Sequence, residues 1–205
     1  MKRILILLVA LFFLVSLVEA QNNKLEIGDK APMTDVKMKD VSGKMFSLKD
    51  VKMGNGVLVL FSSNTCPFVI RWEDRYNELK TWADKHEVGM IVLNSNYQKR
   101  QGVDSFEKMK EKAKTEDYKS YYVVDAESKI ANAMGGQTTP HVFLFDGDFK
   151  LAYKGAIDDS YKNSKLVAQP YAKDAIAQLA SGETIKVAET KPVGCSIKRK
   201  LEKSH

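Results

Sequence analysis

Residues 57–61 read Val-Leu-Val-Leu-Phe, an unbroken apolar run of the kind that forms a central strand buried on both faces. From residue 69 to residue 83 the period changes, and apolar side chains recur at helical steps of three and four. This spacing places one apolar stripe against a sheet and leaves Glu73, Asp74 and Lys80 on more solvated faces. A buried strand followed directly by an amphipathic helix predicts an α/β domain in which helices cover a sheet.

The alternation of strands and helices continues to residue 179. Further strands are expected at residues 88–93, 121–125, 141–145 and 149–155, and further helices at 103–116, 129–134 and 171–179. The Asp-Gly-Asp turn at 146–148 makes the last two strands an antiparallel hairpin. Upstream, residues 37–48 predict another short hairpin with Ser42-Gly43 at its turn. We therefore expect an α/β fold with a mixed central sheet, flanking helices and an N-terminal hairpin extension.

Residues 1–20 have the features of a secretory signal peptide. A pair of basic residues precedes an apolar stretch at residues 4–18, and Val18-Glu-Ala20 supplies a cleavage site. The apolar stretch is shorter than the ~20 residues of a membrane span, which favours cleavage near Gln21 over a retained anchor. We therefore expect an exported protein, periplasmic or secreted, with no stable membrane anchor after cleavage.

The rest of the chain reads as one domain, residues 21–182, and a polar tail, residues 183–205. Its basic residues are interspersed with acidic ones and lack interleaved aromatics, so the formal net charge of +6 does not predict nucleic acid binding. The histidines at positions 86, 141 and 205 lack the spacing of metal ligands, and no glycine-rich phosphate loop is present. We expect neither a metal nor a cofactor.

The chain contains two cysteines, Cys66 and Cys195. Cys66 follows the first central strand at the start of the predicted helix, and Pro67 suits the first helical turn. Unpaired backbone N–H groups and the positive end of the helix dipole favour a thiolate at this place. Ser63, three residues earlier, has a hydroxyl that can donate to a thiolate or a substrate oxygen, or can merely cap the helix. The pattern therefore predicts a reactive thiol at Cys66.

Two further features lie at the ends of predicted strands. Thr138-Thr-Pro140 precedes the strand at 141–145, where a proline is tolerated at the first position. Asp158-Asp159 follows the strand at 149–155, and we expect these two carboxylates to be solvated at the surface.

Five separate segments resemble one family. They are Gly28-Asp-Lys-Ala-Pro32, Phe61-Ser-Ser-Asn-Thr-Cys-Pro-Phe-Val69, Thr139-Pro140, Tyr153-Lys-Gly-Ala-Ile-Asp-Asp159 and Lys191-Pro-Val-Gly-Cys-Ser-Ile-Lys198. With the order of the predicted elements, they resemble the thioredoxin-fold superfamily over residues 24–182 and, within it, the peroxiredoxin-like redoxin branch related to the AhpC/TSA proteins. The resemblance implies a thioredoxin-like fold and thiol-based redox chemistry.

The resemblance also implies roles for individual residues. Cys66 would be the attacking thiolate, Ser63 its polar neighbour, and Thr139-Pro140 a cis-proline loop beside the sulfur. Cys195 would resolve a sulfenic acid or a mixed disulfide formed at Cys66. Ser63 stands where thioredoxin-like members have the first cysteine of Cys-x-x-Cys, and Val59 stands where peroxiredoxins have a proline.

Two functions are compatible with this pair of thiols. The leading hypothesis is an exported thiol-disulfide oxidoreductase or peroxiredoxin-like antioxidant protein, whose partner is an exported thiol reductant, a disulfide-containing substrate protein or a peroxide. The alternative is a catalytically retired thioredoxin-fold binding module in which a structural Cys66–Cys195 disulfide holds the tail across the domain. Closing a loop of about 130 residues would stabilise the fold by roughly 4–5 kcal/mol.

Overall fold

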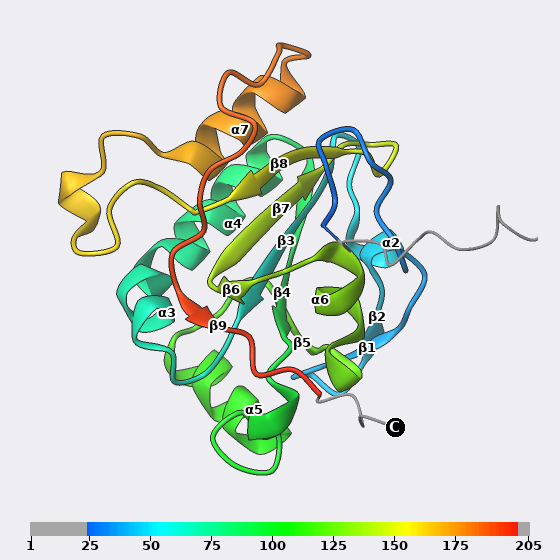
Figure 1. Ribbon diagram of the computed structural model, residues 1–205, viewed down its shortest axis with the longest axis vertical. Helices are drawn as coiled ribbons and strands as arrows, with labels where there is room; N and C mark the ends of the chain where they lie inside the picture. The colour runs from blue at the N-terminus through cyan, green and yellow to red at the C-terminus, as the bar shows by residue number, and fades with distance from the viewer. Residues whose placement is uncertain (1–23, 201–205) are drawn as a thin grey trace, which may run out of the picture.

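The computed structural model describes residues 24–200 (Figure 1). The predicted signal peptide, residues 1–20, lies outside the described residues. Within residues 24–200, no helix is both long enough and apolar enough to cross a membrane.

A seven-stranded mixed sheet forms the centre of the fold (Figure 1). Its strands are β1 (Met38–Asp40), β2 (Met45–Phe46), β3 (Gly56–Ser62), β4 (Val88–Asn94), β5 (Tyr121–Val124), β7 (His141–Phe145) and β8 (Leu151–Gly155). Their order across the sheet is β2-β1-β5-β4-β3-β7-β8. The three inner strands β3, β4 and β5 are parallel, and all other neighbours are antiparallel. The mixed sheet and the two hairpins, β1–β2 and β7–β8, agree with the prediction from sequence.

Helices cover both faces of this sheet. The α-helices are α2 (Leu48–Val51), α3 (Pro67–Trp72), α4 (Tyr76–Lys85), α5 (Phe106–Thr115), α6 (Lys129–Met134) and α7 (Tyr171–Ala180), and short 3-10 turns lie at η1 (Glu73–Arg75), η2 (Tyr97–Lys99), η3 (Ala126–Ser128) and η4 (Ser164–Leu166). Alternate residues of β3 point to opposite faces. Leu58 and Leu60 pack with side chains of α3, α4, α5 and α7, whereas Val57 and Val59 pack with α2 and α6. The core therefore consists of two apolar clusters with β3 between them.

The helix that follows Cys66 is broken in two. The apolar stripe from residue 69 to residue 83 is buried as predicted, but η1 separates α3 from α4. Glu73, predicted on a solvated face, is buried. Lys112 Nζ lies 2.7 Å from one carboxylate oxygen, and the Tyr118 hydroxyl donates to the other. The prediction was wrong because α5 and the segment after it supply partners that let this carboxylate leave water.

The end of the chain is docked on the domain as a strap, residues 188–200 (orange to red in Figure 1). Backbone hydrogen bonds join its first residues to β8 and its later residues to the segment before β7. Between these points β9 (Cys195–Ser196) pairs with β6 (Thr138–Thr139) in a separate antiparallel two-stranded sheet. The strap thus carries Cys195 to the end of β3 at which Cys66 lies.

Candidate active site

Cys66 lies between the end of β3 and the start of α3. It is the N-cap residue of α3, and Pro67 occupies the first helical position. The residue is only 6% exposed. Its thiol donates a hydrogen bond to the backbone carbonyl oxygen of Thr139, 3.0 Å from the sulfur. The structure therefore places the predicted thiol at a helix N-terminus and also buries it.

Thr139 connects the two cysteines. The Thr139–Pro140 peptide bond is cis, and Thr139 lies opposite Cys195 in the β6–β9 pair. Gly194 packs so closely that a Cβ added there would lie 2.3 Å from the Thr139 carbonyl oxygen. The lack of a side chain at Gly194 thus lets the strap lie directly against the loop that contacts the Cys66 sulfur. Both cysteines carry free thiols.

The surroundings of Cys66 favour its thiolate. Burial by itself raises the pKa of a thiol, because the charged form loses its hydration. Hydrogen bonds to the sulfur outweigh this effect: the side chains of Cys195 and Thr139 donate, and so do the backbone N–H groups of Val69 and Cys195. The pKa of Cys66 consequently lies below the ordinary value for a thiol.

The pKa of Cys195, in contrast to that of Cys66, is raised. Burial, its hydrogen bond to Cys66 and repulsion by the Cys66 charge raise the pKa of Cys195 to about 11, although Lys198 acts in the other direction. Cys66 is therefore the first of the two to lose its proton, and Cys195 keeps its own proton well above neutral pH.

Ser63 contacts the backbone of the turn. Its Oγ accepts a hydrogen bond from the Cys66 N–H at 3.3 Å and lies 3.5 Å from the Thr139 hydroxyl. Both contacts hold the turn of Cys66 against the loop of Thr139. Ser63 does not cap α3, whose N-cap residue is Cys66 and which has no side-chain cap; its hydroxyl instead supports the backbone of the turn that carries the thiol.

A model of the AhpC/TSA family matches residues 27–154, more than half of the chain. The chain belongs to the AhpC/TSA family. The matched residues include Ser63, Cys66, Thr139 and Pro140, whereas the strap with Cys195 lies beyond them. Family membership and the observed architecture confirm the predicted thioredoxin-like α/β fold.

Several solved structures are similar to this chain. A hypothetical protein from Sinorhizobium meliloti is 26% identical, with a TM-score of 0.79, and the match covers 87% of this chain and 97% of that one. An uncharacterized conserved protein from Geobacillus kaustophilus is 29% identical, with a TM-score of 0.79 and coverage of 89% and 96%. Peroxidoxin BcpB from Mycobacterium tuberculosis is 16% identical, with a TM-score of 0.57 and coverage of 77% and 97%. Among curated proteins, none matches the chain.

A buried polar network supports the turn before Cys66 in this AhpC/TSA-family chain. Asp104 Oδ1 accepts hydrogen bonds from the backbone N–H of Asn64 and the side-chain amide of Asn94, both at 2.7 Å. The Tyr122 hydroxyl donates to the side chain of Asn64 at 2.8 Å. All four of these side chains are buried. Their mutual hydrogen bonds hold the backbone of Asn64 in one position, because breaking any of them leaves a buried polar group unpaired.

The same network extends to the strap. Asp104 Oδ2 accepts from the side-chain amide of Asn96 at 3.0 Å, and Asn96 Oδ1 accepts from the backbone N–H of Lys198 at 2.8 Å. One carboxylate therefore joins the turn of Cys66 to the strap just beyond Cys195. The sequence patterns did not single out these residues. The signal that could have found them is polar side chains placed directly after the buried parallel strands, where open α/β sheets build their sites.

Asp158 is another buried carboxylate, and the prediction that it is solvated is wrong. It is 5% exposed and accepts hydrogen bonds from Trp72 Nε1 and Arg75 Nη1, each at 2.8 Å. Asp159 is exposed, as predicted. The Asp158 contacts tie α3 and η1 to the loop after β8. Sequence pattern could not show this, because Arg75 comes from a segment 83 residues away.

Metal-ligating side chains are dispersed in the described part of the chain. Among residues 24–200, no three His, Cys, Asp or Glu side chains lie together as a metal site requires. His141 packs against Phe143, which belongs to the apolar cluster on the other face of the sheet from the cluster that contains Cys66. The reactive groups at Cys66 are therefore the two thiols and their hydrogen-bond partners.

Proposed function

We propose that this protein is an exported, thiol-dependent oxidoreductase that uses Cys66 as its nucleophile and Cys195 as its resolving thiol. Its substrate is a peroxide or a disulfide bond, and an exported thiol reductant restores the pair. One observation carries the proposal: a thiol whose pKa is lowered at a helix N-terminus lies beside a second thiol whose pKa is raised. The signal-like pattern of residues 1–20 and membership of the AhpC/TSA family support it.

With a peroxide, the Cys66 thiolate attacks one oxygen and the O–O bond breaks. Cys66 becomes a sulfenic acid, and the leaving oxygen takes up a proton and departs as water or an alcohol. Cys195 then attacks the sulfenic sulfur, so that an S–S bond forms and water leaves. Two electrons pass from the two thiols to the peroxide.

With a disulfide, the Cys66 thiolate attacks one sulfur and the other sulfur leaves as a thiolate. Cys195 attacks the mixed disulfide at the Cys66 sulfur and releases the rest of the substrate as a second thiol. Both routes leave a Cys66–Cys195 disulfide. The chain has no further cysteine, so an external thiol reductant must reduce this bond before the next turnover.

The charges at the site set the order in which the thiols act. The charge on Cys66 contributes to the raised pKa of Cys195. Once Cys66 has reacted and is neutral, this repulsion is gone, while Lys198 still favours the Cys195 thiolate. Cys195 therefore becomes easier to ionise only after Cys66 has reacted.

The burial of Cys66 supports a second candidate, the binding module. Because Cys66 is only 6% exposed beside the strap, a Cys66–Cys195 disulfide would be shielded from reductants and would hold the strap in place. The chain would then act on a partner through its surface. The oxidoreductase requires the strap to admit a substrate, and the binding module requires it to stay closed.

Mass spectrometry of the purified protein, before and after one equivalent of hydrogen peroxide or of a small disulfide, tests both candidates. The oxidoreductase predicts that the reduced protein forms the Cys66–Cys195 disulfide, that Cys66→Ser stays unreacted, and that Cys195→Ser stops at a sulfenic acid or mixed disulfide. The oxidant that reacts faster identifies the substrate class. A Cys66–Cys195 disulfide that resists millimolar dithiothreitol in the folded protein would reject the oxidoreductase in favour of the binding module.

A further inference from the structure

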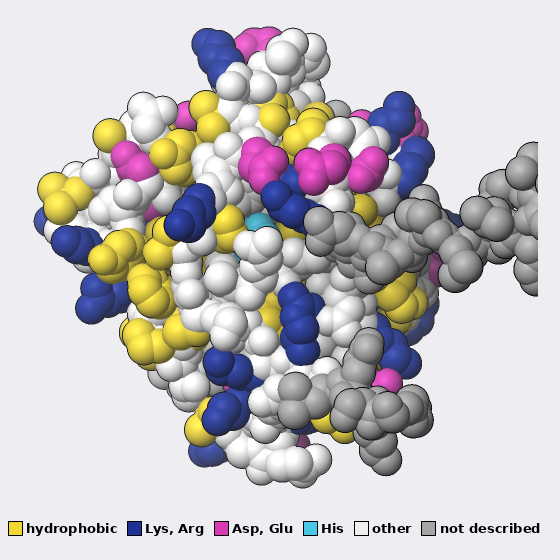
Figure 2. All heavy atoms as spheres, viewed as in Figure 1, with side chains coloured by type: hydrophobic (Ala, Val, Ile, Leu, Met, Phe, Trp, Pro, Cys, Tyr) yellow, Lys and Arg dark blue, Asp and Glu magenta, His cyan; other side chains and the backbone are white. Residues whose placement is uncertain are grey.

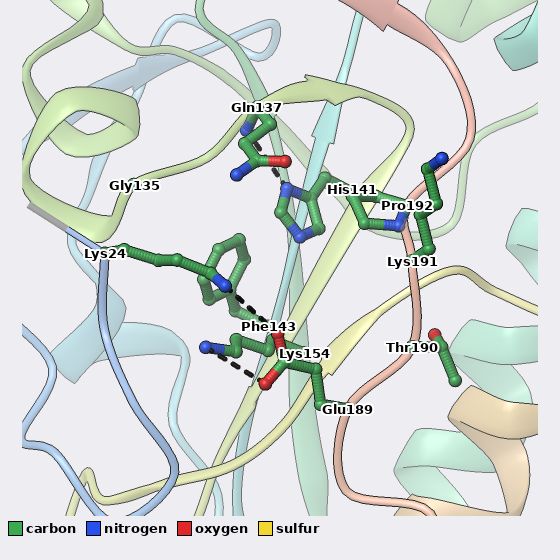
Figure 3. A pocket seen from close by; sticks show the side chains of 10 residues that line it. All are labelled: Lys24, Gly135, Gln137, His141, Phe143, Lys154, Glu189, Thr190, Lys191 and Pro192. Atoms are coloured by element: carbon green, nitrogen blue, oxygen red, sulfur yellow. Dashed lines mark hydrogen bonds and ion pairs between the residues drawn. The ribbon is translucent and has the colours of Figure 1, made fainter.

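A cavity of about 300 Å³ lies on the face of the sheet that carries the Phe143 cluster, away from Cys66 (Figure 3). Its walls come from the end of α6, from β7 and β8, and from strap residues 189–192. Figure 2 shows a histidine in a hollow of this face, with basic and acidic side chains beside it. The volume is at the lower end of the roughly 300–1,000 Å³ of small-molecule sites.

His141 presents one N–H group to this cavity. The residue is 4% exposed, and its Nδ1 accepts a hydrogen bond from the backbone N–H of Gln137 at 3.1 Å. The proton of the neutral ring is therefore on Nε2. Nε2 points into the cavity (Figure 3) and has no hydrogen-bond partner among residues 24–200. Because this N–H faces the cavity and has no protein acceptor among residues 24–200, an acceptor that a ligand places here would form a hydrogen bond with it.

The charged side chains around the cavity are mostly basic. Lys24, Lys154 and Lys191 line it, together with a single carboxylate, that of Glu189. Glu189 Oε1 lies 3.3 Å from Lys24 Nζ, and Glu189 Oε2 lies 3.4 Å from Lys154 Nζ. Glu26 Oε2 also lies 3.3 Å from Lys154 Nζ. The charges of Glu189 and Glu26 are thus compensated by Lys24 and Lys154, and Lys191 leaves the cavity with one excess positive charge.

We propose that this cavity binds the carboxylate of a small organic acid. The carboxylate accepts a hydrogen bond from His141 Nε2–H and lies beside Lys24 Nζ, which Figure 3 shows directed toward the same space. The apolar part of the ligand lies against Phe143 and Pro192. The site is separate from Cys66, so the proposal does not depend on the redox function.

The electrostatics of His141 agree with an anion site. Burial, and then the charges of Lys154 and Lys24, lower the pKa of His141 to about 3, so the ring is neutral at physiological pH. The two lysine charges that oppose a proton on the ring attract a carboxylate. A bound carboxylate would in turn favour the imidazolium, and the pKa of His141 should therefore rise when the ligand binds.

Titration of the full chain with sodium benzoate, followed by NMR of the His141 imidazole, tests the proposal. Sodium chloride keeps the ionic strength constant, so that general salt effects are removed. We expect a saturable shift of the His141 resonances and a higher pKa of His141 in the complex. Benzyl alcohol has the same ring without the carboxylate, and it should bind at least about tenfold more weakly.

A pair of lysine variants provides the matched control. Lys24→Gln removes one charge from a side chain that is 47% exposed, so the fold should remain intact, and the affinity for benzoate should fall about tenfold. Lys186→Gln removes an exposed lysine outside the cavity and should leave the affinity unchanged. The proposal is overturned if benzoate gives no saturable shift at His141, if benzyl alcohol binds equally well, or if Lys24→Gln binds benzoate like the parent chain.

Discussion

Cys195 lies opposite Thr139 in the antiparallel β6–β9 pair. The carbonyl oxygen of Thr139 is in turn 3.0 Å from the sulfur of Cys66. The loop and the strap thereby bring two unbonded thiols together, and each thiol changes the pKa of the other. The reactivity of Cys66 should consequently depend on whether the strap stays docked.

The pH dependence of alkylation should separate the two thiols. The midpoint of the rate of Cys66 alkylation by iodoacetamide should lie below the ordinary thiol pKa of about 8.5. In Cys195→Ala the Cys195 S–H donor is lost, so the midpoint for Cys66 should rise. In Cys66→Ala the Cys66 thiolate no longer repels the negative charge that forms on Cys195, so the midpoint for Cys195 should fall from about 11.

The pH midpoint of each alkylation profile reports the ionisation of the thiol, whereas the plateau rate at high pH reports how easily iodoacetamide reaches the sulfur. A change in pKa can therefore be distinguished from a change in exposure. Ser196→Ala changes the exposed neighbour of Cys195 and should leave the midpoint for Cys66 in place. A midpoint for Cys66 at or above the ordinary thiol pKa of about 8.5 would show that burial outweighs the hydrogen bonds to its sulfur.

Gly194→Ala should separate β9 from β6. The added Cβ would lie 2.3 Å from the Thr139 carbonyl oxygen, an overlap that requires the backbone to move. We expect the free energy of unfolding to fall by about 1–3 kcal/mol and the plateau rate of Cys66 alkylation to increase. In Gly102→Ala, the matched control, the Cβ would meet only the Lys99 carbonyl oxygen, at 3.8 Å. An unchanged plateau rate in Gly194→Ala would show that the strap does not shield Cys66.

Asp104→Asn should loosen the turn of Cys66 and the strap together. Asparagine has a single acceptor oxygen and would turn its NH₂ group toward a donor, either the Asn64 N–H or the Asn96 amide. We expect a loss of about 1–3 kcal/mol in the free energy of unfolding. Hydrogen exchange at the Lys198 amide should be faster, and the Cys66–Cys195 disulfide should form more slowly after oxidation.

Asp40→Asn is the matched control for Asp104→Asn. Asp40 is also buried and accepts from the backbone N–H groups of Ser42 and Tyr122, but it belongs to the N-terminal hairpin. This variant should lose comparable stability and keep the parent rates of Lys198 exchange and disulfide formation. Equal slowing of disulfide formation in both variants would mean that Asp104 acts through general stability alone.

Acid should destabilise the fold through His141. The pKa of His141 is about 3 in the folded chain and about 6.5 in the unfolded chain. The unfolded chain therefore gains a proton first, and stability falls as the pH decreases from about 6.5 toward 3, by on the order of 4 kcal/mol. His141→Phe has no such proton site, so urea unfolding should show a shallower loss of stability between about pH 7 and pH 4. Equal pH dependence in both proteins would contradict a neutral buried imidazole.

Much of the fold could be predicted from the sequence, because periodicity records which side chains are buried. β3 extends one residue beyond the predicted run 57–61 at each end. The prediction is weaker where local capping decides: α5 begins at Phe106 rather than at residue 103, because the Ser105 hydroxyl caps it. The prediction is also weaker at η1, because the apolar side chains keep their helical spacing there although the α-helix itself is interrupted.

The candidate site was predictable only in part. The motifs indicated Cys66, Ser63 and the Thr139–Pro140 loop from neighbours along the chain. Burial of the carboxylates of Asp104 and Asp158 could not be predicted in the same way. A charged side chain leaves water only where other segments bring it hydrogen-bond partners, and its own hydropathy says nothing about them.

Local chemistry is enough to specify the α/β class, the thiol of Cys66 at a helix N-terminus and the lack of a second thiol in its turn, since each depends on residues a few positions apart. The meeting of Cys66 with Cys195 and the position of His141 beside a cavity emerge only in the folded chain. These contacts join distant segments, and the free energy of packing the whole domain decides which segments meet.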